Sequence, residues 1–182
     1  MALVESTPFE IGKTAPDFEL LNTVNGQTSS LSQLRGEQGT AILFICNHCP
    51  FVVHILDELI QLGKDYAETG VNLIAISSNN IQSHPQDGPE YMKSIGEKLG
   101  FPYLFDESQE IARAYGAICT PDLYLFDGDL KLTYRGQLDD SRPGNNIPVS
   151  GNDLRNAINC LIQNETNTAV QKPSIGCSIK WK

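Results

Sequence analysis

The sequence has 182 residues, of which 40% are hydrophobic and 19% are charged, values typical of a single soluble globular domain. Its formal net charge of -9 provides no basic surface for phosphates, so we expect no nucleic-acid partner and no membrane partner. The longest strongly apolar run, Ala41 to Cys46, is far shorter than the roughly 20 residues of a membrane-spanning helix.

Turn residues and hydrophobic periodicity predict alternating strands and helices. Asn25-Gly26 between two extended segments is the strongest short signal of a β-hairpin. Pro50 favours a helix start, because proline is preferred in the first helical position. The expected strands lie at 18–21, 27–29, 40–45, 71–77, 103–105, 123–126 and 131–134. The expected helices lie at 50–70, 90–99, 109–115 and 152–163, with a polar loop at 78–89.

This alternation predicts an α/β fold with a central mixed, mostly parallel sheet, helices on both faces and the hairpin as an N-terminal extension. We expect one domain over residues 1–182, with a polar lead-in over 1–13 and a C-terminal tail over 164–182. The N-terminus has neither the basic nor the apolar segment of a signal peptide, which favours a cytoplasmic location.

The segment 46–50 (Cys-Asn-His-Cys-Pro) joins a predicted buried strand to the following helix. Residues i and i+3 of a first helical turn lie about 5–6 Å apart, which matches the separation that a disulfide requires. Unpaired N–H groups and the positive end of the helix dipole favour a thiolate at this position. A protonated His48 would add to that stabilisation. The spacing therefore predicts a redox-active pair, Cys46 and Cys49.

Two other interpretations of this segment stay open. The two cysteines can be buried thiols without chemistry. Alternatively, Cys46, His48 and Cys49 can ligate a metal ion, although a structural zinc site normally needs four ligands in two close pairs and no second pair is present in the sequence. We therefore expect no metal and no cofactor.

Further motifs accompany this pair, at 12–20 (GKTAPDFEL), at 31–36 (LSQLRG) and at Thr120-Pro121. Together they resemble the thioredoxin superfamily, in its peroxiredoxin-like, AhpC/TSA-like branch, over nearly the whole chain. The resemblance implies a thioredoxin-like fold, and it implies that Pro121 is cis and faces the cysteine pair. The backbone beside this proline can then pair with an extended peptide or a glutathione-like substrate.

The chain departs from the peroxiredoxin pattern at its most diagnostic positions. Such sites usually have Pro-x-x-x-Thr-x-x-Cys and a distant arginine that supports the thiolate. Aligned on Cys49, the threonine position holds Cys46. Aligned on the expected strand at 123–126, the usual arginine position falls near Pro121. Arg113 and Arg135 are substitutes in principle, but each is expected to be a surface salt-bridge residue. We therefore predict disulfide exchange in preference to peroxide reduction.

In the predicted mechanism Cys46, as the exposed cysteine, attacks a substrate disulfide, and Cys49 resolves the mixed disulfide. Oxidising members of the superfamily resemble this chain at the position of His48. We therefore expect a reduction potential above the roughly −270 mV of thioredoxin. Cys119 is expected to be a packed small residue and Cys177 an incidental tail thiol, with a third redox role as the alternative for each. The residues expected to support the pair are Asn47, His48, Pro50, Cys119, Thr120 and Pro121.

The expected partners are a protein or small-molecule disulfide or peroxide as substrate and a thiol reductant, in a monomer or homodimer with a role in antioxidant defence. Two alternatives remain. One is a thiol peroxidase with Cys49 as the peroxidatic cysteine and Cys46 as the resolving one. The other is a metal-binding module like a copper chaperone, since soft thiolates favour Cu(I). Related copper-assembly proteins have Cys-x-x-x-Cys, one residue longer than the spacing here.

Overall fold

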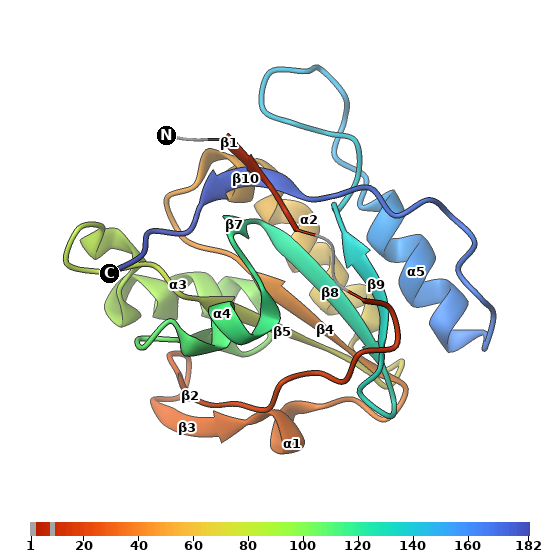
Figure 1. Cartoon of the computed structure of the whole chain (residues 1–182). Coiled ribbons are helices and arrows are strands. Elements are labelled where there is room, and N and C mark those ends of the chain that lie inside the picture. The colour runs from red at the N-terminus through yellow and green to blue at the C-terminus, as the bar shows by residue number, and fades with distance from the viewer. Residues whose placement is uncertain (1–2, 8–9) are drawn as a thin grey trace.

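The structure of the protein, a computed structural model, describes residues 3–7 and 10–182 (Figure 1). The strands are β1 (Leu3–Glu5), β2 (Glu19–Asn22), β3 (Gln27–Ser30), β4 (Gly39–Phe44), β5 (Val71–Ser77), β6 (Tyr103–Phe105), β7 (Cys119–Thr120), β8 (Asp122–Asp127), β9 (Leu132–Gly136) and β10 (Ile175–Ser178). The helices are α1 (Leu31–Leu34), α2 (Pro50–Tyr66), η1 (Pro85–Asp87), α3 (Pro89–Leu99), α4 (Glu110–Tyr115) and α5 (Asn152–Ile162). None of the helices between these bounds has the length and apolar character needed to cross a lipid bilayer.

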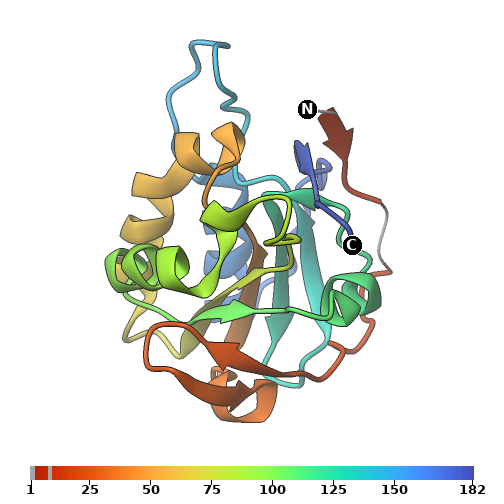
Figure 2. The same cartoon turned by 90° about the vertical axis from the view of Figure 1, so that its left-hand side faces the viewer.

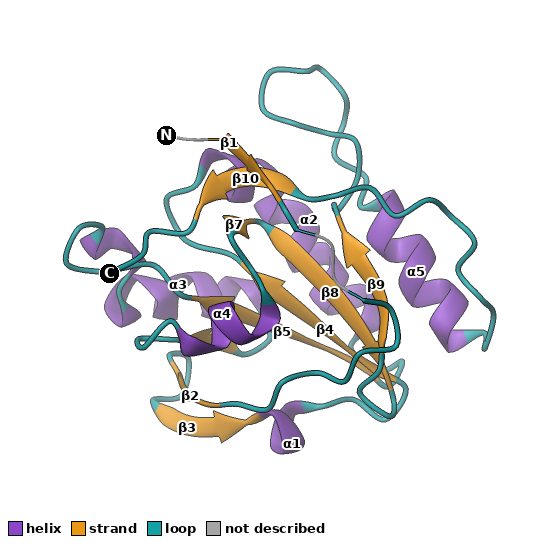
Figure 3. Cartoon of the chain, viewed as in Figure 1, coloured by secondary structure: helices purple, strands orange, loops and turns teal. Residues whose placement is uncertain are grey.

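The central sheet of the described chain has the strand order β3-β2-β6-β5-β4-β8-β9 (Figure 3). Its strands β4, β5 and β6 are parallel neighbours, because α2 and α3 carry the chain back between them. The remaining neighbours pair antiparallel, and two of these pairs are hairpins that reverse the chain through short turns. The expectation of a mostly parallel sheet is therefore wrong: the sheet is mixed and mostly antiparallel. The predicted N-terminal hairpin, β2–β3, is confirmed.

Strand β4 lies at the centre of the fold, and all six of its residues are buried. Ala41 and Leu43 belong to the core beneath α2, α3 and α5. Ile42 and Phe44 belong to the core on the opposite face, beneath α1 and α4. Figure 2 shows these two layers of helices on either side of the sheet. This arrangement confirms the predicted helices on both faces and explains the continuous apolar run in the sequence.

The pairing of β4 with β8 fixes where the cysteine segment lies. Phe44, the last residue of β4, is the antiparallel partner of Asp122, the first residue of β8. The chain that leaves β4 at Ile45 therefore meets the chain that enters β8 through Thr120 and Pro121. The Thr120–Pro121 peptide bond is cis.

Both ends of the described chain form a second sheet, in the order β1-β10-β7 (Figure 1). The segment 164–182, expected as a tail, contains β10, which pairs antiparallel with β1 on one side and with β7 on the other. Of the expected lead-in, residues 3–5 form β1, while residues 1, 2, 8 and 9 lie outside the described residues. The C-terminal strand thus lies beside the chain that precedes Pro121.

A buried ion pair anchors the start of β8. Arg135 Nη2 on β9 lies 2.7 Å from Asp122 Oδ2, and the two side chains are 4% and 0% exposed. Arg135 also donates to the Gly116 carbonyl, and the Tyr124 hydroxyl donates to Asp122. Burial raises the pKa of Asp122, and the Arg135 guanidinium opposes that shift. The expectation that Arg135 is a surface residue is therefore wrong, because its charge is needed inside the fold to pair with Asp122.

We predict that Asp122→Ala lowers the free energy of unfolding by about 3–5 kcal/mol, because it leaves the buried Arg135 charge without its carboxylate. Urea unfolding at neutral pH measures this loss. Asp129→Ala, at an exposed position of the turn after the same strand, is the matched control and should change stability by no more than about 0.5 kcal/mol. Equal effects of the two substitutions would contradict the prediction.

Candidate redox site

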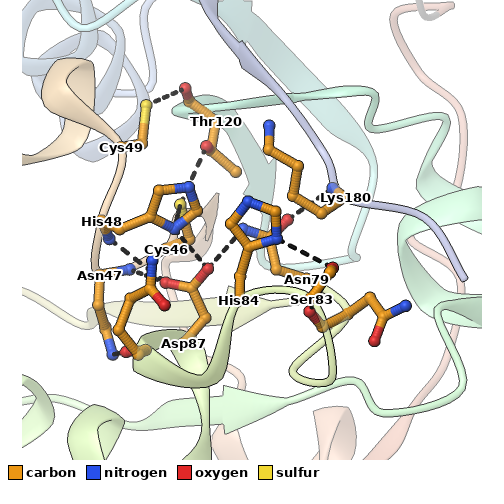
Figure 4. A network of polar contacts seen from close by, with 12 residues as sticks. Cys46, Asn47, His48, Cys49, Asn79, Ser83, His84, Asp87, Thr120 and Lys180 are labelled. Carbon is orange, nitrogen blue, oxygen red and sulfur yellow. Dashed lines mark hydrogen bonds and ion pairs between the residues drawn. The ribbon is translucent and has the colours of Figure 1, made fainter. Parts of the chain in front are cut away.

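The two cysteines lie where β4 gives way to α2 (Figure 4). Cys49 is the N-cap residue of α2 and Pro50 is its first helical residue, which confirms the predicted helix start. The backbone N–H groups of Val52 and Val53 both reach the Cys49 carbonyl at 2.9 Å, as expected of a helix start. Cys49 is therefore held at the positive end of the helix dipole, where a thiolate is stabilised.

Thr120 contacts both thiols. Its hydroxyl oxygen lies 3.4 Å from Cys46 Sγ, and its backbone carbonyl accepts a 3.2 Å hydrogen bond from a protonated Cys49. The two sulfurs are also hydrogen-bonded to each other. All five cysteines are free in the described chain, and only Cys46 and Cys49 are in contact with Thr120 through the hydrogen bonds above.

The surroundings of the two sulfurs separate their pKa values. The hydrogen bond from the Cys46 thiol lowers the pKa of Cys49 to about 4; burial opposes this shift, while the Cys177 thiol and two backbone N–H groups add to it. The same bond to Cys49 raises the pKa of Cys46, and burial and the Asp87 carboxylate raise it further. The Thr120 carbonyl accepts a hydrogen bond from a protonated Cys49 and so favours the thiol form. The several hydrogen-bond donors around the Cys49 sulfur favour the thiolate form instead. The surroundings thus lower the pKa of Cys49 and raise that of Cys46.

Neither cysteine is exposed, since Cys46 retains 1% and Cys49 0% of its accessible surface. The expectation that Cys46 attacks because it is the exposed cysteine is therefore not supported, since the two cysteines do not differ in exposure. Because the thiolate is the nucleophilic form, the local electrostatics favour Cys49 as the nucleophile.

Asp87 of η1 holds the residues between the two cysteines. Its Oδ1 accepts the backbone N–H of Asn47 at 2.8 Å and that of His48 at 3.3 Å. Its Oδ2 lies 2.6 Å from His48 Nδ1 and accepts a hydrogen bond from Asn79 at 2.8 Å. The Asp87 side chain is fully buried. The predicted supporting residues Asn47 and His48 are thus positioned by a carboxylate from a different segment of the chain.

The His48 ring lies between Asp87 and Cys46. Its Nδ1 is 3.9 Å from Cys46 Sγ, and the ring stacks on His84 with 4.8 Å between centroids (Figure 4). Ligand atoms of Cys46, His48 and Asp87 lie within 4.8 Å of one another, close enough to share a metal ion. However, the same Nδ1 is hydrogen-bonded to Asp87, and three donors are one fewer than a structural zinc site uses. The short contact of His48 Nδ1 is therefore the hydrogen bond to Asp87, and the Cys46 sulfur lies beside that same nitrogen at the longer distance.

Cys119 lies apart from these contacts. It is buried, its Sγ lies 3.8 Å from the Pro121 carbonyl, and burial raises its pKa. It is therefore a packed thiol, as expected. Arg113 is exposed and lies over the Trp181 ring, and Arg135 is paired with Asp122, so each has a partner other than a cysteine of the pair.

Asp87 was not predicted as a site residue, and Cys177 was expected to be an incidental thiol, with a redox role only as the alternative. Asp87 lies in the segment 78–89, which was expected to be only a polar loop. A usable signal existed, because β4 and β5 are parallel neighbours and the segments that follow them must emerge at the same edge of the sheet. For Cys177 no local signal was available, since its place depends on the pairing of β10 with β7.

Comparisons with known proteins identify the family and the fold of the chain. The AhpC/TSA family model matches residues 11–135. Peroxiredoxin 2 of Picrophilus torridus is 35% identical over 118 residues, which are 61% of this chain and 54% of that protein. The thiol-disulfide oxidoreductase ResA of Geobacillus thermodenitrificans is 28% identical over 131 residues, 70% of each chain. The chain thus spans about half the length of the first relative and more of the second.

Two solved structures are similar to this chain, one over its whole length and the other over most of it. An uncharacterized conserved protein from Geobacillus kaustophilus is 53% identical, with a TM-score of 0.97 over 100% of this chain and 97% of that one. The thioredoxin domain of a thiol-disulfide oxidoreductase from Bacteroides vulgatus is 16% identical, with a TM-score of 0.64 over 85% of this chain and 99% of that one, a likeness of fold alone. With a thioredoxin-like fold and a family match that spans more than half of its residues, this chain belongs to the AhpC/TSA family.

Proposed function

We propose that the protein is a thiol-disulfide oxidoreductase that uses the Cys46–Cys49 dithiol/disulfide pair. The observation that carries this proposal is the placement of the Cys46 and Cys49 sulfurs at the start of α2, with Thr120 in contact with both. Neighbouring sulfurs can form a disulfide with little movement of the backbone, and the low pKa of Cys49 supplies a nucleophile at neutral pH. The matches to ResA proteins support it.

The proposed reaction takes two exchange steps. The Cys49 thiolate attacks one sulfur of a substrate disulfide, forms a mixed disulfide and releases the other half of the substrate as a thiolate. Cys46 then gives up its proton and attacks the Cys49 sulfur, which releases the second half of the substrate. The substrate gains two electrons, and the pair becomes the Cys46–Cys49 disulfide. These roles reverse those expected from the sequence, because the proton of the reduced pair resides on Cys46.

Partners and location are part of the same proposal. A protein or small-molecule disulfide serves as substrate and a thiol reductant restores the pair, in the cytoplasm and in a monomer or homodimer. The backbone beside Pro121 is paired with β10 in this structure, so an extended substrate would align on it only where β10 is displaced.

A second candidate function is thiol-dependent peroxide reduction. It is favoured by the low pKa of Cys49, which stands at the peroxidatic position, and by the similarity to a peroxiredoxin. The peroxide would oxidise Cys49 to a sulfenic acid, and Cys46 would condense with it to form the disulfide and water. Oxidation of the reduced protein by hydrogen peroxide, faster than by oxidised glutathione, would favour this function over disulfide exchange.

We expect a redox titration in glutathione buffers to yield one reversible Cys46–Cys49 disulfide, located by mass spectrometry. Its potential should lie above the roughly −270 mV of thioredoxin, because a stabilised Cys49 thiolate favours the reduced form. In the matched pair of variants, Cys46→Ser should retain oxidation at Cys49, whereas Cys49→Ser should leave Cys46 reduced. Oxidation of Cys46 in Cys49→Ser would indicate instead that Cys46 attacks and Cys49 resolves, as expected from the sequence. Absence of any disulfide at Cys49 from the wild type would overturn the proposed function.

We also predict that the ultraviolet absorbance of the Cys49 thiolate persists at neutral pH and disappears as the pH falls through about 4. Cys46→Ala removes the main hydrogen-bond donor, so the midpoint should rise toward the ordinary cysteine pKa near 8.5. Cys46→Ser keeps a hydroxyl donor in nearly the same volume and should titrate below Cys46→Ala. The same midpoint in the wild type and Cys46→Ala would refute this account of the low pKa.

A further inference from the structure

The C-terminal strand β10 brings a third cysteine to the redox pair. Cys177 is the antiparallel partner of Thr120, the residue that contacts both Cys46 and Cys49. It is 4% exposed. Its thiol and its backbone N–H both hydrogen-bond the Cys49 sulfur. Cys49 therefore has two thiol neighbours, one from the strand-to-helix segment and one from the far end of the chain.

The position of Cys177 is fixed by its neighbours on β10. A Cβ atom at Gly176 would lie 2.0 Å from the Thr120 carbonyl oxygen, so only a glycine lets β10 approach β7 this closely. On one side, the Ser174 hydroxyl donates to the Gly136 carbonyl at 2.6 Å. On the other, the Ile179 N–H donates to the Ile118 carbonyl at 2.9 Å. Cys177 is thus held against the pair from both directions along the strand.

We propose that Cys177 is a third redox cysteine of this protein, which competes with Cys46 for the disulfide bond to Cys49. The proposal rests on the proposed function, because it uses the same Cys49. It does not derive from the family pattern, since the AhpC/TSA match covers residues 11–135 and Cys177 lies beyond them.

The exchange balances without a further oxidant. Starting from the Cys46–Cys49 disulfide, the Cys177 sulfur attacks Cys49 Sγ, forms the Cys49–Cys177 bond and breaks the Cys46–Cys49 bond. Cys46 leaves as a thiolate and takes up the proton that Cys177 gives up. One disulfide and one thiol are present both before and after this step, so the protein is neither oxidised nor reduced by it. The substrate keeps the two electrons that it gained when the Cys46–Cys49 pair was oxidised.

The charge on Cys49 links this step to the redox state of the pair. In the reduced protein, burial and the neighbouring Cys49 sulfur raise the pKa of Cys177 to about 12, so Cys177 stays protonated. When Cys49 enters a disulfide, its negative charge is gone, and Cys177 loses its proton more readily. Oxidation of the pair therefore favours the attack, whereas reduction suppresses it.

Cys119 is close by but differently oriented. Its thiol points to the Pro121 carbonyl, 3.8 Å from that oxygen, whereas the contact with the Cys49 sulfur is made by Cys177. The exchange is therefore expected to be specific for Cys177.

The test uses the full chain carrying Cys46→Ser, treated with oxidised glutathione and mapped by mass spectrometry without reduction. We expect a Cys49–Cys177 peptide, because Cys177 resolves the glutathione adduct on Cys49. The matched variant Cys46→Ser/Cys177→Ser should accumulate the glutathione adduct on Cys49 instead. Adding Gly176→Val to Cys46→Ser keeps the thiols but displaces β10, and should abolish the Cys49–Cys177 peptide; Val170→Ala, at an exposed position before β10, should leave it unchanged.

The outcomes separate this proposal from the proposed function. A persistent glutathione adduct on Cys49 in Cys46→Ser, or a Cys49–Cys119 peptide in place of Cys49–Cys177, overturns the role of Cys177 even if the wild type forms Cys46–Cys49. Absence of Cys46–Cys49 from the single variant Cys177→Ser, in which Cys177 cannot displace Cys46, overturns the proposed function. The substitution Cys177→Ser replaces only the sulfur atom of the side chain. If the Gly176→Val variant does not fold, the comparison of Cys46→Ser with Cys46→Ser/Cys177→Ser still tests the role of Cys177.

Discussion

The antiparallel pairing of β4 with β8 is the constraint on which the rest of the site depends. The register that sets Phe44 opposite Asp122 brings the residues after one strand against the residues before the other. Thr120 consequently reaches both sulfurs, with its hydroxyl near Cys46 and its carbonyl near Cys49. The same short segment forms β7, which gives β10 an edge to pair with. A shift of this register by one residue would move the contacts with both thiols at once.

Cys46 and Cys49 are chemically identical, but their surroundings shift their pKa values in opposite directions. Cys49 has the helix N-terminus and several hydrogen-bond donors, whereas Cys46 has the buried carboxylate of Asp87 nearby. Opposite shifts of two titratable groups in one site favour different roles for them, and here they favour Cys49 as the nucleophile of the proposed exchange. Because both sulfurs are buried beneath these same contacts, a substrate reaches them only when part of the covering structure moves.

Most elements were predictable because their signals are local. Asn25-Gly26 marks a hairpin and Pro50 begins a helix within the segment that contains the signal. Strand direction was predicted wrongly, because it depends on which distant strands pair and not on the alternation of strands with helices. The candidate site divides in the same way. The spacing of Cys46 and Cys49 is visible in the sequence, whereas Asp87 and Cys177 join them only through contacts between segments far apart along the chain.

The pairing of β1 with β10 has a practical consequence for work on this protein. Leu3 is the register partner of Cys177, so the first and last strands of the described chain, β1 and β10, lie side by side (Figure 1) at the third cysteine. Anything fused to either end is tethered beside the cysteines. A polyhistidine tag would hold bound metal ions next to thiols, and a bulky fusion would press on the strands that cover them. Purification tags are therefore chemical variables of this site, and their removal belongs to the preparation of the protein for redox measurements.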